Sequence, residues 1–392
     1  MTERLYYADA WLRTFSATVV AMEDDGKRVY LNRSAFYPTS GGQPHDTGRL
    51  HSATVIDVVD EQERIAHVCE SAVGCAVGDT VECAIDWERR FDHMQQHSGQ
   101  HVLSALLADA YGWPTVSVHF GAETNTVDVA ASDIDAQAIA EIERRVNVLI
   151  AEGHTIRASF EDAASAAGLR KASDRTGLLR IITIDDVDRS ACGGTHVAQT
   201  GAIGSMLLRR AERTKGNSRI EFVCGLRAVA RARADSALLT RAARLFTASP
   251  EALPTLVESQ LQRTVELERE RKRLTSELAV FQARELFDAT EPNVAGVRFV
   301  KLPPMDGPVK SAEVRVQALL TLGPCVVLAV SPSTHGIMLG TSEASGVDAG
   351  AALRDALQSV GGRGGGTSRL AHGAAGDMLS LDSVVRTLGF SR

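Results

Sequence analysis

Two short motifs, far apart in the chain, place the strongest constraint on its fold. His97 and His101 begin and end the stretch His-Ser-Gly-Gln-His, and Cys192 and His196 begin and end the stretch Cys-Gly-Gly-Thr-His. On a helix, this histidine spacing puts both imidazoles on one face, one turn apart. Imidazole nitrogens and a cysteine thiolate are ligands that Zn2+ prefers in proteins. The motifs therefore predict one zinc site that the fold must assemble from distant segments.

The residues around the first motif indicate a helix from Asp86 to Ala110. Apolar side chains recur there with helical spacing, and charged residues lie between them. Asp86 is a suitable N-cap, and Gly112-Trp113-Pro114 is a stop signal. Gly99 weakens a helix interior by about 1 kcal/mol relative to alanine. We therefore expect another backbone or a substrate to approach the helix closely at Gly99.

Each candidate ligand also has a simpler interpretation. A histidine pair on a helix can be an ordinary core or surface feature, and Cys192 could be a small buried hydrophobic residue, as most free cysteines are. The glycines between Cys192 and His196 favour the metal, because they free the backbone to bring both side chains to one point. His93 lies one turn before His97 on the same face, where it could contact a ligand or be solvated.

The bulk composition is that of an ordinary soluble globular protein. The chain has 392 residues, of which 44% are hydrophobic and 23% charged, and this length suits about two to three domains. Its apolar runs are too short to cross a bilayer, and its first residues do not resemble a secretion signal. The cysteines, at positions 69, 75, 83, 192, 224 and 325, show no framework spacing. This pattern fits a cytoplasmic protein without disulfides.

The net charge of −7 argues against nonspecific coating of nucleic acid. One stretch, Leu207 to Arg244, is nevertheless strongly basic. Its basic residues are Arg209, Arg210, Arg213, Lys215, Arg219, Arg227, Arg231, Arg233, Arg241 and Arg244. Such a face could follow phosphates, or it could be a solvated helix surface, and the stretch alone favours neither interpretation.

The hydrophobic pattern predicts an α+β protein in four parts. Residues 1–85 alternate apolar and polar side chains in short runs, which indicates a small antiparallel β-barrel-like domain. Residues 86–240 mix helices and strands around a central sheet and carry the zinc motifs. Residues 241–292 form a long charged helix with an imperfect apolar stripe, read as a coiled-coil linker or as a solvent-exposed helix. Residues 293–392 form a compact α/β domain.

A glycine run, Gly361 to Gly366, follows the predicted helix Ala349–Val360 in the last domain. Glycine at this density lets a backbone approach a ligand or a neighbouring chain closely, or it makes a flexible link. No Lys-Ser or Lys-Thr follows, so the run is not a nucleotide-binding P-loop.

The zinc motifs, together with Gly41-Gly42-Gln43-Pro44 and Asp46, resemble the editing domain of alanyl-tRNA synthetases and of their freestanding AlaX relatives. The long helix and the run Gly361–Gly366 look like the coiled coil and the DHH-associated C-terminal domain of those synthetases. The resemblance covers nearly the whole chain and points to the large AlaX class. A synthetase would need several hundred residues before the editing domain, whereas this chain begins at the β-domain. We therefore expect no aminoacylation activity.

The resemblance implies an aminoacyl-tRNA deacylase that hydrolyses mischarged Ser-tRNA(Ala), and in some members Gly-tRNA(Ala), in trans. It implies that His97, His101, Cys192 and His196 hold Zn2+. Such editing is needed because an alanine pocket rejects serine only about a hundredfold. Gln43 and, second, Thr39 are expected to face the zinc helix, where either could bond the seryl hydroxyl; otherwise both are turn residues. The sequence shows no serine or cysteine nucleophile with a base, so the catalytic residues stay unassigned.

Several questions stay open at this point. Four protein ligands would close a tetrahedral zinc, so either one histidine swings away, or zinc holds the amino acid or ribose while water is activated elsewhere. One rival interpretation is a zinc-stabilised RNA-binding protein without turnover. Another is an editing hydrolase for a different mischarged tRNA, since threonyl-tRNA synthetases carry a related domain. The long helix or the C-terminal domain could join two chains into a homodimer.

Overall fold

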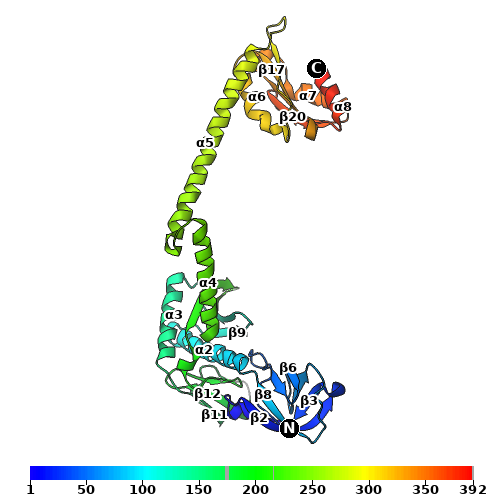
Figure 1. Cartoon of the computed structure of the whole chain (residues 1–392). Helices are drawn as coiled ribbons and strands as arrows, with labels where there is room; N and C mark the ends of the chain where they lie inside the picture. The colour runs from blue at the N-terminus through cyan, green and yellow to red at the C-terminus, as the bar shows by residue number, and fades with distance from the viewer. Residues whose placement is uncertain (173–175, 215, 391–392) are drawn as a thin grey trace. The chain divides into compact units, whose positions relative to one another are not determined.

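The computed structural model describes residues 1–172, 176–214 and 216–390 (Figure 1). The chain divides into two compact units, Met1–Ala242 and Ala243–Arg392, and the boundary falls inside helix α4 (Gly225–Leu245). This division does not test the finer four-part division predicted from the sequence. Among the described residues, no helix has both the length and the apolar character needed to span a membrane.

The first unit begins with six strands that pair in a ring. Strand β8 pairs with both β2 and β5, so the order β2-β3-β7-β6-β5-β8 closes into a barrel. Alternate residues of β2, namely Phe15, Ala17 and Val19, point into the barrel core, as the period-two pattern predicts. The ring strands are β2 (Thr14–Glu23), β3 (Arg28–Leu31), β5 (Gly48–Leu50), β6 (Ala53–Glu61), β7 (Arg64–Cys69) and β8 (Thr80–Ile85). The flanking elements are β1 (Glu3–Arg4), α1 (Leu5–Ala8), η1 (Asp24–Gly26) and β4 (Arg33–Ser34).

Helix α2 (Trp87–Tyr111) follows β8 directly and is the central helix of the unit (Figure 1). The side chain of Asp86 caps its N-terminus by accepting from the backbone N–H of Arg89, and Gly112 ends it in the left-handed region with φ of 66°. Both predicted boundary signals are thus confirmed. A Cβ at Gly99 would collide with the Cys224 side chain, so side chains, and not a second backbone, make the close approach at this position.

Two separate sheets accompany α2, whereas the hydrophobic pattern predicted one central sheet. One sheet has the order β14-β15-β10-β9 and the other the order β11-β12-β13. The prediction was wrong here because hydrophobic patterns mark strands but do not identify their partners. The strands are β9 (Thr115–Phe120), β10 (Asn125–Val129), β11 (Ile156–Asp162), β12 (Leu178–Ile184), β13 (Asp188–Ala191), β14 (Met206–Thr214) and β15 (Asn217–Cys224), joined by α3 (Ala136–Ala151) and η2 (Thr200–Ile203).

The second unit begins with η3 (Pro250–Ala252) and the long helix α5 (Leu253–Asp288). The apolar stripe of α5 is exposed in this chain, for example at Leu261 (64% exposed). The buried residues of α5 lie in its C-terminal part and are Ala279, Ala283 and Phe287. A sheet of order β16-β17-β18-β20-β19 follows. Its elements are β16 (Arg298–Lys301), η4 (Val309–Ala312), α6 (Glu313–Leu320), β17 (Cys325–Ser331), η5 (Pro332–Thr334), β18 (Gly336–Thr341), η6 (Glu343–Ser345), α7 (Ala349–Gln358), β19 (Arg363–Gly366), β20 (Leu370–Ala374) and α8 (Met378–Thr387).

The glycine run of the second unit is a packed edge strand. Gly361 has φ of 71° and turns the chain after α7, and the following residues form β19, which pairs with β20. A Cβ at Gly364 would collide with the Leu357 side chain. The close approach at Gly364 is therefore to this chain's own helix and strand, and the run is a paired strand and not a flexible link.

A buried ion pair connects the barrel to α2. Both Arg90 of α2 and Asp46 are fully buried, and Arg90 Nε donates to the two carboxylate oxygens of Asp46 at 2.9 and 3.0 Å. Arg90 also donates to the carbonyl of Ala10 at 2.9 Å, and Asp46 accepts from the backbone N–H of Tyr37 at 2.6 Å. This network fixes the loop that carries Gln43 against the helix that carries His97.

We predict that Asp46→Asn lowers the free energy of unfolding of the first unit by about 3–5 kcal/mol, because it leaves the buried charge of Arg90 without a counter-ion. All three tryptophans, at positions 11, 87 and 113, lie in this unit. Denaturant unfolding followed by tryptophan fluorescence therefore measures its stability. The control is Asp185→Asn, which breaks a pair with Arg157 whose side chain is 66% exposed and should cost less than about 1 kcal/mol. Equal losses in the two variants would contradict the prediction.

Candidate metal centre

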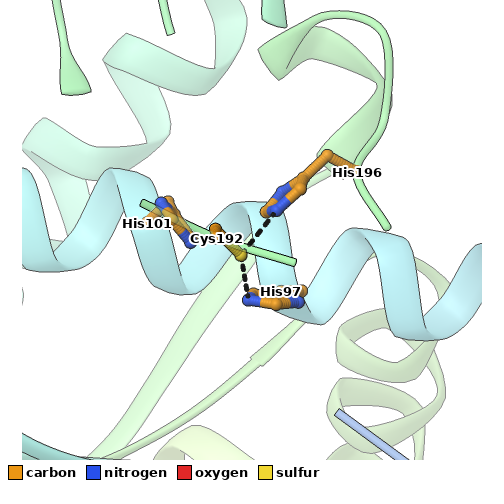
Figure 2. A group of neighbouring side chains, drawn as sticks. All are labelled: His97, His101, Cys192 and His196. Carbon is orange, nitrogen blue, oxygen red and sulfur yellow. Dashed lines mark hydrogen bonds between the residues drawn. The ribbon is translucent and has the colours of Figure 1, made fainter. Parts of the chain in front are cut away.

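The four predicted ligands converge in the structure, as Figure 2 shows. His97 and His101 project from successive turns of α2, while Cys192 and His196 lie on the loop after β13. One potential ligand atom from each side chain lies within 4.8 Å of all the others. The sequence motifs thus identified a cluster that could hold a metal ion.

Each imidazole is oriented by a hydrogen bond from Nδ1. His97 Nδ1 lies 2.8 Å from Gln43 Oε1, and His101 Nδ1 lies 2.7 Å from Asp188 Oδ2. His196 Nδ1 lies 3.1 Å from the hydroxyl of Ser98. With Nδ1 occupied in this way, Nε2 is the nitrogen left to bind a metal.

The sulfur of Cys192 lies among these Nε2 atoms. It is 3.4 Å from His97 Nε2 and 3.3 Å from His196 Nε2 (Figure 2). Burial raises the pKa of the Cys192 thiol, but the neighbouring His97 and His196 outweigh burial and hold that pKa well below its usual range. Burial lowers the pKa of His101, but its hydrogen bond to Asp188 overcomes burial and raises that pKa to about 9. A thiolate and three imidazoles with oriented rings form a donor set that fits Zn2+.

The backbone of the second motif is tightly packed around the centre. A Cβ at Gly194 would collide with the His97 ring and would lie 2.9 Å from Gln43 Oε1. Neither Gly193 nor Gly194 has a positive φ. Glycine is therefore needed at position 194 for space, and not for the backbone freedom expected from the sequence. Arg180 holds the same loop by donating to the carbonyls of Cys192 at 2.9 Å and Gly194 at 2.8 Å.

The two predicted substrate residues occupy different environments. Gln43 is buried, and its Oε1 accepts from His97 and from the backbone N–H of Thr195, while its Nε2 donates to Thr195 Oγ1 at 2.8 Å. Thr39 is exposed, and its hydroxyl lies 3.2 Å from His45 Nδ1. Contact of either residue with a seryl hydroxyl stays a prediction.

Sequence reasoning missed two of the residues that orient the clustered imidazoles. Ser98 and Asp188 were not identified, because each contacts an imidazole that lies far away in the chain. Asp188 also accepts from Arg170 Nε at 2.7 Å. Their only sequence signal is position: Ser98 lies inside the first motif, and Asp188 lies just before the second.

Five of the nine described basic residues in the basic stretch form ion pairs with carboxylates. Arg209 and Arg210 contact Glu221, and Arg219 contacts Asp128 at 2.7 Å. Arg227 pairs with Asp92, and Arg231 lies 3.2 Å from Asp235. Lys215 lies outside the described residues. In the described part of the stretch, no ion pair forms at Arg213, Arg233, Arg241 or Arg244. Ion pairs within the protein therefore offset part of the charge of the basic stretch.

We predict about one zinc per chain, and Cys192→Ala should lose most of it because the thiolate is the only anionic donor in the cluster. Asp188→Asn should weaken zinc affinity by about 10–100-fold, since it removes the acceptor that orients His101. Metal analysis and chelator competition measure both effects. The control is Cys75→Ala, a cysteine outside the cluster that should leave the stoichiometry unchanged. Full zinc content in Cys192→Ala would remove that residue from the site.

Family comparisons agree with this geometry. Residues 179–221, which include Cys192 and His196, match the family described as "Threonyl and Alanyl tRNA synthetase second additional domain". Residues 10–89 match "tRNA synthetases class II (A)".

Individual relatives cover different parts of the chain. The alanine–tRNA ligase of Pyrococcus furiosus is 33% identical over 314 residues, which are 76% of this chain and 34% of that protein. The chain thus spans about a third of that relative. The alanyl-tRNA editing protein AlaX-L of Pyrococcus horikoshii is 28% identical over 95% of this chain and 94% of its own length. The alanyl-tRNA editing protein AlaX-M of Methanosarcina mazei is 34% identical over 57% of this chain and 96% of its own length. The chain therefore belongs to the AlaX family of alanyl-tRNA editing proteins.

Proposed function

We propose that this protein hydrolyses the ester bond of mischarged Ser-tRNA(Ala) in trans and so releases serine, with Gly-tRNA(Ala) as a second substrate. The observation that carries the proposal is the His3Cys cluster with its oriented imidazoles. The names of the AlaX relatives support alanyl-tRNA as the substrate class. The reaction adds water across the ester and yields free amino acid and the ribose hydroxyl.

The chain's own residues would bind and orient the ester. When bound, Zn2+ would supply a Lewis acid that stabilises the charge developing on the ester carbonyl oxygen. Gln43 and Asp188 hold His97 and His101 in fixed rotamers, so the centre does not need to reorganise as that charge develops. His97, His101 and His196 are buried and Cys192 is only half-buried, so the centre is largely shielded from bulk water. No residue is assigned as the base.

The closed set of four donors also favours a second candidate, a zinc-stabilised tRNA-binding protein without turnover. The two candidates differ in whether serine is released. We also propose that the protein acts in the cytoplasm and does not charge tRNA itself. Supplying ATP, alanine and uncharged tRNA(Ala) in the same assay tests the latter point.

We predict that the purified protein releases serine from Ser-tRNA(Ala) at least about a hundredfold faster than alanine from Ala-tRNA(Ala). A site built to bond a hydroxyl leaves buried polar groups unpaired when the hydroxyl is absent, which gives strong discrimination. The measurement is deacylation of Ser-, Gly-, Thr- and Ala-tRNA, with and without a chelator. Hydrolysis of none of these esters by zinc-loaded protein would favour the binding candidate, and a preference for Thr-tRNA would indicate a different editing substrate.

Two variants test which residue contacts the seryl hydroxyl of the substrate. Gln43→Leu and Thr39→Val should each reduce the serine preference, chiefly by slowing serine release, if that residue contacts the substrate. Zinc content must be measured in Gln43→Leu, because Gln43 also orients His97. Thr54→Val is the control for Thr39→Val, since Thr54 is an exposed threonine on β6. Unchanged selectivity in both variants would exclude Thr39 and Gln43 as the discriminating residues.

We further predict that a chain ending near Phe246 keeps its zinc but has a higher KM for charged tRNA. The first unit is compact without the second. The long helix and the run Gly361–Gly366 of the second unit resemble the C-terminal part of alanyl-tRNA synthetases. The exposed apolar stripe of α5 also supports a homodimer. Steady-state kinetics and sedimentation of the full and shortened chains measure both properties. An unchanged KM with loss of a dimer would assign the second unit to dimerisation.

A further inference from the structure

A small cavity lies beside the metal centre. Its volume is about 10 Å3, which is room for one water-sized group. The lining residues include Gln43, His93, Gln96, Phe120, Asn125 and Arg227. Two of them touch His97: Gln43 by the hydrogen bond to Nδ1, and Phe120 by a ring contact with 5.2 Å between centroids. A group in this cavity would therefore lie close to a metal ligand.

Most polar groups around the cavity already have hydrogen-bonding partners. Gln96 Oε1 accepts from Asn125 Nδ2 at 2.9 Å and from the backbone N–H of Cys224 at 2.8 Å. Gln96 Nε2 donates to Asp92 at 3.1 Å and to the carbonyl of Cys224 at 3.0 Å. Arg227 is bonded to Asp92 and to the carbonyl of Gly121. These side chains form a rigid wall.

Among the described residues, two polar groups that line the cavity have a hydrogen-bonding position without a partner. His93 of α2 is only 7% exposed, and within the described part of the chain its Nδ1 is buried without a hydrogen-bonding partner. The amide nitrogen of Gln43 carries two hydrogens, and the bond to Thr195 uses one of them. A buried polar group without a partner is destabilising, so each such group calls for a ligand or water. In the described part of the chain, His93 thus forms no hydrogen bond to the candidate metal ligands, and its Nδ1 is shielded from solvent.

The protonation state of His93 suits a neutral, polar ligand. Burial, followed by the positive charges of Arg89 and Arg227, lowers the pKa of His93 to about 3. The ring is therefore neutral at pH 7 and carries one N–H donor and one acceptor nitrogen. A hydroxyl group also donates one hydrogen bond and accepts others. It could accept from the Gln43 amide and donate to the acceptor nitrogen of His93, whereas a methyl group can do neither.

Building on the function proposed above, we propose that His93 and the Gln43 amide together bind one hydroxyl of the aminoacyl-ribose ester, so that His93 is a specificity-determining residue. The ester carbonyl must react at the metal centre, and two hydroxyls lie within a few bonds of it. One is the side-chain hydroxyl of serine, and the other is the free hydroxyl of the terminal ribose. Both share the chemistry that the two unpaired groups require.

The test compares wild type with His93→Phe, which fills similar space without polar atoms. If the bound group is the seryl hydroxyl, His93→Phe should lower kcat/KM on Ser-tRNA(Ala) about 10–100-fold. Its kcat/KM on Gly-tRNA(Ala) should change less than about twofold. If the bound group is the ribose hydroxyl, kcat/KM should fall by the same factor for both substrates. Ser-tRNA(Ala) that lacks the free terminal ribose hydroxyl should then react equally with wild type and variant. His93→Gln, whose amide also donates and accepts, should retain more activity than His93→Phe.

Zinc content and tryptophan fluorescence establish that each variant is folded. His154→Phe is the matched control, because His154 lies in the first unit and outside this cavity. If His93→Phe does not fold, His93→Ala takes its place, and added imidazole should restore part of its rate. Equal rates of wild type and a folded, zinc-loaded His93 variant on both intact substrates would overturn the inference. Absence of serine release by wild type would instead overturn the proposed function.

Discussion

The buried ion pair between Arg90 and Asp46 is the contact on which the geometry of the site depends. Removing two charges from water costs several kcal/mol for each ion, so such a pair persists only where its hydrogen bonds are complete. Here Arg90 also binds the carbonyl of Ala10, and Asp46 also accepts from Tyr37. Asp46 lies just after Gln43, and Arg90 lies two turns before His97. One contact therefore sets both the loop and the helix that meet at the Gln43–His97 hydrogen bond.

The sequence predicted the parts of this site that depend on local spacing. His97 and His101 lie on one helix face because four residues make about one turn, and Asp86 and Gly112 mark the ends of that helix. Residues that act across long sequence distances could not be predicted in this way. Neither Ser98 nor Asp188 carries a periodic signal that links it to a particular imidazole. The pairing of the strands around α2 could not be predicted from the sequence for the same reason.

The glycine run and the basic stretch show a second limit of sequence patterns. Gly364 is needed because Leu357 occupies the space of a side chain, a packing requirement that looks the same in sequence as flexibility or ligand contact. Likewise, Arg219 and Arg227 are basic residues whose charges are offset by Asp128 and Asp92 from other elements. Composition gives the charge of a segment, but only the fold shows how much of that charge is free to meet phosphate.

The metal centre and the neighbouring cavity differ in how completely their polar groups are paired. The Nδ1 atoms of the three clustered histidines have partners, whereas His93 and one amide hydrogen of Gln43 have none in the described part of the chain. A fully paired centre discriminates little between bound molecules, because its polar groups already have partners. Unpaired groups do discriminate, since only a substrate with a matching polar group removes their cost. Gln43 belongs to both sets, so the side chain that would select a hydroxyl is also the one that orients His97.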